Sequence, residues 1–89
     1  MTDIIWDPKA RDFLRKLDKH IANRIYITVE DRISNNVERY LESLKGYDFL
    51  KIRVGDYRLF VDYYRKDNLL IIRMVDYRGK AYKHLRRTK

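Results

Sequence analysis

The spacing of apolar residues changes near the middle of the chain, and no other feature of the sequence constrains the fold as strongly. Apolar residues recur every four positions from Ile21 to Leu41, which is typical of a helix with one buried face. From Asp48 onward the period is two, which is typical of strands that bury one face. The pattern therefore predicts helices first and a sheet afterwards.

Two helices are predicted in the first half of the chain. The apolar stretch 2–6 predicts a short strand, and a helix follows from Asp7-Pro8, because Asp is favoured at the N-cap and Pro at the first helical position. The four-residue spacing predicts a second, longer helix over residues 19–44. Gly46 stands just beyond it, where a C-terminal cap is expected.

In the second half, Gly55-Asp56 predicts a two-residue hairpin loop, with Gly first as a type II′ turn prefers. The loop sets the register of its two strands, so that the facing pairs are Val54 and Tyr57, Arg53 and Arg58, Ile52 and Leu59, and Lys51 and Phe60. Further strands are predicted over 57–64 and 69–75, joined by a polar turn at 65–68, and a basic stretch follows over 76–89.

These elements define an α+β fold in the order β-α-α-β-β-β, within a single domain over residues 1–89. The strands of the second half are expected to be antiparallel, because their connections are too short for crossovers. We expect the helical hairpin to cover one face of the sheet and the other face to be open and concave. A basic C-terminal tail completes the chain.

The net charge of +8 is carried by the second half of the chain. Residues 1–44 contain equal numbers of basic and acidic residues, whereas residues 45–89 contain 13 Lys/Arg and five Asp. This asymmetry favours a polyanionic partner over a basic surface kept for solubility. The chain has no cysteine, and His20 and His84 have no ligand-like spacing, so neither a metal nor a small-molecule cofactor is expected. No stretch resembles a membrane span or a signal peptide, which favours a cytoplasmic location without a membrane partner.

Three cations are predicted to share one face of the hairpin: Lys51, Arg53 and Arg58. Like charges directly opposite one another are destabilising in a sheet. Lys and Arg side chains bind phosphate oxygens well, and Arg binds them with two parallel hydrogen bonds. We expect no acidic side chain to lie between these three cations, and we expect Asp62 to lie farther along the same face. We therefore interpret the group as a phosphate-binding patch, with a structural role as the alternative.

Aromatic residues interleaved with cations are typical of single-stranded RNA binding, in which rings stack on bases and cations meet phosphates. The residues predicted to contact RNA in this way are Phe60, Tyr64, Lys80, Lys83, Arg86 and Arg87. Arg78 is expected at the edge of the patch, and Tyr82 follows it. Nearby cations favour the phenolate of a tyrosine, which lowers its pKa and suits it to general-base catalysis. With eight tyrosines in the chain, packing is the competing interpretation for Tyr82.

The sequence resembles the RelE/ParE toxin superfamily over nearly its whole length. The segment 51–59 (KIRVGDYRL) is similar to the most specific motif of the family. Residues 6–18 resemble the start of its helical hairpin, and Leu44-Lys45-Gly46 resembles the junction before its sheet. Arg78 and Tyr82 resemble its closing element.

The resemblance to the RelE branch implies a metal-independent endoribonuclease that cuts mRNA in the ribosomal A site, with the 2′-hydroxyl of the RNA as nucleophile, and so inhibits translation. Residue by residue, it implies that Tyr82 is the general base and that Arg78 serves the phosphate or the leaving oxygen. Lys51, Arg53 and Arg58 would stabilise the phosphorane, although Arg53 stands where RelE members usually have Lys. Lys51 and His84 are the alternative bases.

The same resemblance implies three partners, which are a cognate antitoxin, the ribosome and mRNA. Tyr26 and Ile27 lie off the apolar stripe, so they either pack on the first helix or contact a partner such as an acidic, helical antitoxin. Two other functions stay open: a ParE-like toxin that inhibits DNA gyrase by binding, or a basic RNA-binding module without chemistry.

Overall fold

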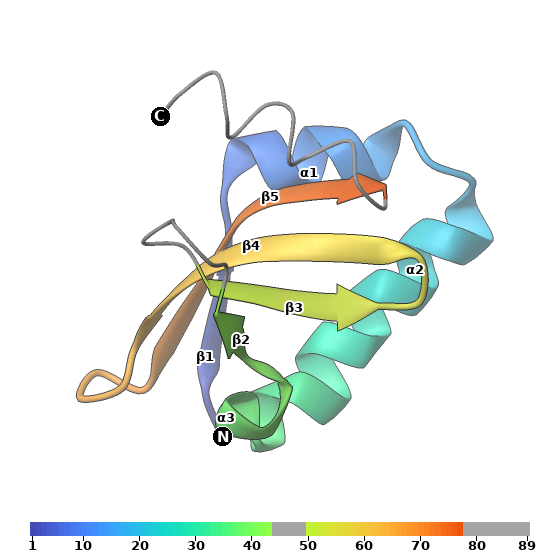
Figure 1. Cartoon of the computed structure of the whole chain (residues 1–89). Coiled ribbons are helices and arrows are strands. Elements are labelled where there is room, and N and C mark those ends of the chain that lie inside the picture. The colour runs from blue at the N-terminus through green and yellow to red at the C-terminus, as the bar shows by residue number, and fades with distance from the viewer. Residues whose placement is uncertain (44–49, 78–89) are drawn as a thin grey trace.

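The computed structural model describes residues 1–43 and 50–77, and within them five strands form a single sheet with helices on one side (Figure 1). The strands lie in the order β1-β5-β4-β3-β2. The elements are β1 (Asp3–Trp6), α1 (Pro8–Arg15), α2 (Lys19–Ile27), a π-helical turn (Thr28–Arg32), a 3-10 turn (Ile33–Asn35), α3 (Val37–Tyr40), β2 (Glu42–Ser43), β3 (Leu50–Val54), β4 (Tyr57–Tyr64) and β5 (Leu69–Tyr77). The predicted α+β fold is confirmed.

Helix α1 begins as the sequence predicts. The side chain of Asp7 caps it by accepting a hydrogen bond from the backbone N–H of Lys9 at 3.1 Å, and Pro8 occupies the first turn. Asp18 caps α2 in the same way, through the N–H of His20 at 2.8 Å. The cap at Asp18 sets the end of the short connection between the two helices.

The prediction of one continuous helix over 19–44 is wrong beyond Ile27. The apolar spacing explains part of the difference, because four residues exceed the 3.6 residues of an α-helical turn, so the stripe drifts around a long α-helix. The π-helical turn holds more residues and compensates for this drift. As a result Ile25, Val29, Ile33 and Val37 are all buried.

Side chains that bond to the backbone then end the helical segment. The hydroxyl of Ser34 donates to the carbonyl oxygen of Glu30, and the amide of Asn35 donates to the carbonyl oxygen of Asp31. Such bonds compete with the helical ladder. Asn36 leaves the helical conformation at φ −158°, and Leu41 is extended after the short α3. The chain can therefore enter β2, a strand that the sequence did not predict. Gly46, the predicted C-terminal cap, lies outside the described residues.

The β3–β4 hairpin has the predicted register, including Arg53 opposite Arg58 and Lys51 opposite Phe60. Gly55 has φ +60°, and Asp56 is not in the left-handed region, as a type II′ turn requires. The predicted loop and antiparallel pairing are both confirmed.

Strand β1 pairs in parallel with β5, from Asp3 beside Leu69 to Trp6 beside Ile72, which the sequence did not predict. Asn68, in the left-handed conformation at φ 51°, forms the β4–β5 turn next to this pairing. Its side chain accepts a hydrogen bond from the hydroxyl of Thr2 at 3.0 Å and donates one to the carbonyl oxygen of Met1 at 2.9 Å. The turn therefore anchors the start of β1.

The core lies between the helical segment and one face of the sheet (Figure 1). Its buried residues are Trp6, Ala10, Ile25, Val29, Ile33, Val37, Ile52, Val54, Leu59, Val61, Leu70, Ile72 and Val75. The opposite face is less open than the sequence suggested, since Lys51 and Phe60 are buried there. No helix in residues 1–43 or 50–77 is both long and apolar enough to cross a membrane.

Candidate nucleic-acid interface

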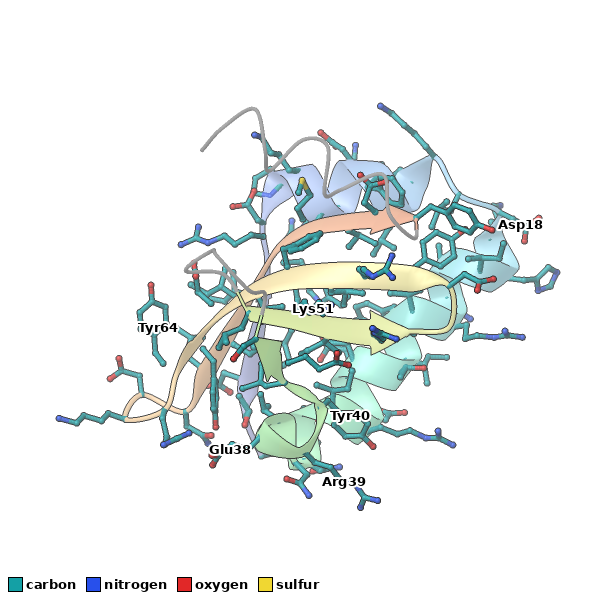
Figure 2. The ribbon with its side chains drawn as sticks, viewed as in Figure 1. Asp18, Glu38, Arg39, Tyr40, Lys51 and Tyr64 are labelled. Atoms are coloured by element: carbon teal, nitrogen blue, oxygen red, sulfur yellow. The ribbon has the colours of Figure 1, made fainter. Side chains whose placement is uncertain are left out.

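The hairpin brings the three predicted cations together on the face of the sheet away from the core. Arg53 and Arg58 are direct cross-strand neighbours, and Lys51 lies two residues before Arg53 on β3. Figure 2 shows Lys51 on β3. Its side chain is only 8% exposed, whereas that of Arg53 is exposed and that of Arg58 is partly buried.

A small cleft lies at the hairpin end of this patch. It is lined by Arg53, Gly55, Asp56, Tyr57 and Arg58, and its volume is about 240 Å³. A water molecule takes up roughly 30 Å³ in the liquid, so the cleft has room for a phosphate group with some of its hydration. Two guanidinium groups on its lining suit that ligand.

Besides Asp56, which lines the cleft, two further carboxylates flank the patch, and this corrects the expectation that no acidic residue lies there. Glu42 on β2 is the cross-strand neighbour of Lys51, and its Oε2 lies 3.5 Å from Nε of Arg53. Asp76 is the cross-strand neighbour of Arg58 on β5. The sequence signal for Glu42 was absent because β2 was predicted as helix. Asp76 was missed because β5 continues two residues past its predicted end at residue 75.

Asp62, which was expected farther along the same face, is paired with Arg73. Its Oδ2 accepts a hydrogen bond from Nε of Arg73 at 2.6 Å, and Nη1 of Arg73 lies 3.4 Å from Oδ2 of Asp7. The hydrogen bond with Asp62 raises the pKa of Arg73 above its ordinary value. Arg73 is thus held between two carboxylates and is poorly placed to bind a phosphate.

The two aromatic candidates on β4 differ in exposure. Phe60 is 1% exposed, which leaves no ring face for a base to stack on in this conformation. Tyr64 is 45% exposed and lies toward the β4–β5 turn, away from Lys51 (Figure 2). Of this pair, Tyr64 has a ring that a base can reach.

The other predicted site residues lie outside the described residues: Arg78, Lys80, Tyr82, Lys83, His84, Arg86 and Arg87. The sequence alone shows that residues 78–89 contain six Lys/Arg and no Asp/Glu. This segment therefore contributes most of the net charge of +8. The cations of the sheet, by contrast, have acidic neighbours.

A second surface lies between α1 and α2, where a groove of about 770 Å³ is lined by Trp6, Arg11, Leu14, Arg15, Leu17, Lys19, Ala22, Asn23 and Tyr26. The rings of Trp6 and Tyr26 stack with their centroids 5.7 Å apart, and Nε1 of Trp6 donates to Glu30 at 2.9 Å. Tyr26 is 48% exposed, so it both packs and faces solvent. The lining combines apolar side chains with three cations and no acidic residue.

No group of three or more His, Cys, Asp or Glu side chains in residues 1–43 and 50–77 is placed to hold a metal ion. The chemistry that the described patch offers is electrostatic stabilisation of negative charge by Lys and Arg.

The chain is similar to solved structures of toxins, several of them from toxin–antitoxin complexes. The chain is similar to a chain of the RelBE2 complex from Mycobacterium tuberculosis, with a TM-score of 0.79 and 23% identity over 86% of this chain and 98% of that one. It is similar to a chain of the RelB–RelE complex from Methanococcus jannaschii, with a TM-score of 0.67 and 26% identity over 90% and 96%. The isolated RelE toxin of E. coli matches with a TM-score of 0.66 and 18% identity over 99% and 98%.

The fold is thus RelE-like, with a helical segment on one face of the sheet, and the other face carries the cationic patch. A family model described as the ParE toxin of the type II toxin–antitoxin system parDE matches residues 4–82. The chain therefore belongs to this toxin family, within the RelE/ParE superfamily. No curated protein sequence matches it significantly.

Proposed function

We propose that this toxin is a ribosome-dependent endoribonuclease that cuts mRNA in the A site and so inhibits translation. The observation that carries the proposal is the patch of Lys51, Arg53 and Arg58, in which the two arginines line a cleft of about 240 Å³. A ParE-like toxin that acts by binding alone has no need for three cations grouped where a phosphate fits. The close structural likeness to RelE toxins agrees with this choice.

In the proposed reaction the 2′-hydroxyl of one nucleotide attacks the adjacent phosphorus, and the bond from phosphorus to the 5′-oxygen of the next nucleotide breaks. Negative charge builds on the phosphorane oxygens, where Lys51, Arg53 and Arg58 stabilise it. A general base removes the proton of the 2′-hydroxyl, and the leaving oxygen takes up a proton. We assign the base to Tyr82 and the contact with the phosphate or leaving oxygen to Arg78, with Lys51 and His84 as the other candidate bases.

Tyr82→Phe tests the base assignment, because it removes the phenol and keeps the ring. We expect this variant to bind ribosomes as the parent does, to lose most of its cleavage, and to stop arresting growth. The measurement is primer extension on mRNA from a translating extract given the purified protein, with ribosome co-sedimentation as the binding control.

His84→Gln is the matched control and should keep most of its cleavage. If Tyr82→Phe cuts at the parental rate and His84→Gln does not, His84 is the base. Normal cleavage by both variants, with none by Arg78→Ala, would move the assignment to Lys51 or water.

The family model that matches the chain is named for ParE, which keeps gyrase inhibition as the second candidate function. The same extract distinguishes the two. Uncut mRNA together with inhibition of DNA supercoiling by purified gyrase would support the ParE-like activity and contradict the endoribonuclease.

We also propose a cognate antitoxin that is acidic and helical, as partner of the groove between α1 and α2. Several similar solved structures are complexes of a RelE toxin with its RelB antitoxin. The apolar side chains that line the groove include Leu14 and Leu17, and its cations are Arg11, Arg15 and Lys19. An amphipathic helix with acidic flanks complements such a groove in shape and charge.

A further inference from the structure

Glu42 lies beside two cations that the proposed reaction uses. It is the cross-strand neighbour of Lys51, and its carboxylate is 3.5 Å from the guanidinium of Arg53. Strand β2 is two residues long, and its pairing with β3 places this carboxylate on the patch.

The patch therefore has an acidic group at each end. Arg53 faces Arg58 on the next strand, Arg58 faces Asp76 on the strand beyond, and Glu42 closes the other end beside Arg53. The carboxylates offset the repulsion between the two facing cations. In a site for a polyanion, however, each carboxylate also opposes the ligand, so its presence needs a reason other than binding strength.

The bond between Glu42 and Arg53 is suited to exchange. Both side chains are about half exposed, at 44% and 57%, and exposed ion pairs of this kind are weak. Arg73 on the same sheet shows the contrast, because two carboxylates hold it and one of them lies at 2.6 Å. Arg53 can exchange the carboxylate of Glu42 for a phosphate at little cost, whereas Arg73 would have to be released from two carboxylates.

We propose that Glu42 is the internal counterion of the patch. It holds the guanidinium of Arg53 until a phosphate of the RNA displaces it, and in this way it sets how tightly the patch binds RNA. The inference rests on the proposed function, since it takes RNA as the ligand, and it adds a residue that limits affinity.

Glu42→Gln tests this role, and Glu38→Gln is the matched control. Glu38 also pairs with an exposed arginine, Arg65, at 2.6 Å, but it lies on α3 away from the patch (Figure 2). Both variants add one unit of net charge and break one surface ion pair. The probe is a short fluorescent 2′-O-methyl RNA, which binds without being cut, titrated at several salt concentrations.

We expect Glu42→Gln to bind this RNA roughly two- to fivefold more tightly than Glu38→Gln, which corresponds to releasing one exposed ion pair. Its affinity should also depend more steeply on salt, with a slope larger by up to about 0.7, because Arg53 can neutralise one more phosphate. Equal urea midpoints for the two variants would show that folding does not cause the difference.

The outcomes separate the two proposals. Equal affinity of the two variants, or weaker binding by Glu42→Gln, overturns the counterion role while leaving RNA binding by the parent intact. If the parent itself shows no salt-dependent binding to the RNA or to ribosomes, both the counterion role and the proposed function fail.

Discussion

Arg53 and Arg58 face one another across the hairpin, yet their surroundings differ. Arg53 is exposed and paired with Glu42, whereas Nε and Nη1 of Arg58 are buried. The two arginines thus carry the same charge but have different structural roles. Arg53 lies on the surface, whereas the side chain of Arg58 also packs against its neighbours.

We therefore expect the two arginines to respond differently to substitution by Gln. Arg53→Gln should change the free energy of unfolding by no more than about 0.5 kcal/mol, as is usual for exposed sites. Arg58→Gln should lower it by about 1 kcal/mol, because packing of a partly buried side chain is lost. Each variant should reduce the salt slope of RNA binding by about 0.7. Urea unfolding and the RNA titration measure the two effects, and a destabilised Arg53→Gln would contradict the exchangeable pair.

Among the elements, the β3–β4 hairpin was the most predictable from sequence. A two-residue loop with Gly first permits one register, so the pairing of Arg53 with Arg58 follows from Gly55-Asp56 alone. The long helix was not predictable, because the bonds of Ser34 and Asn35 to backbone carbonyls depend on where the chain turns.

The remaining differences concern pairings between distant parts of the chain. Local patterns cannot show that β1 pairs with β5, since several elements separate these strands in the chain. They also cannot show that β2 pairs with β3, because the four-residue apolar spacing assigned β2 to a helix. For the same reason the sequence indicated the three cations but missed Glu42 and Asp76. It also indicated Phe60 as accessible, because periodicity assigns a face without telling what covers it.

The hairpin turn carries its own prediction. Gly55 has φ +60°, and a Cβ added there meets no atom within 4 Å, so Ala is disfavoured by backbone conformation alone. Gly55→Ala should lower the free energy of unfolding by about 1–2 kcal/mol. Gly55→Asn should lower it less, because Asn tolerates the left-handed region. Thermal or urea unfolding of the pair is the measurement, and equal losses would show that strain is not the cause.

At the scale of the whole molecule, the two faces of the protein are both basic but in different ways. The helical face has a groove lined by apolar side chains and three cations, and the sheet face has a smaller cleft whose cations have acidic neighbours. A protein partner and a nucleic acid can therefore use separate surfaces.

Arg11→Glu tests the assignment of the helical face, with Arg24→Glu as control, since Arg24 is exposed on α2 and does not line the groove. Both variants should still arrest growth when expressed alone. Co-expression of the cognate antitoxin should restore growth with Arg24→Glu but only poorly with Arg11→Glu, because the new carboxylate repels an acidic helix. Full rescue of both would place the antitoxin elsewhere. The quenching or shift of fluorescence from Trp6, the only tryptophan, reports binding directly.

The pairing of β1 with β5 also determines when the sheet and the core can be completed during synthesis. A ribosome makes residues 3–6 before residues 69–72, which are their neighbours in the sheet, and it makes the turn at Asn68 that anchors them just before β5. Contacts so distant in sequence form late in folding. Trp6 and Ala10 contribute to the core, so a nascent chain that stops before β5 has an incomplete core as well as an unpaired first strand. The fold of this chain can therefore be completed only after β5 has left the ribosome.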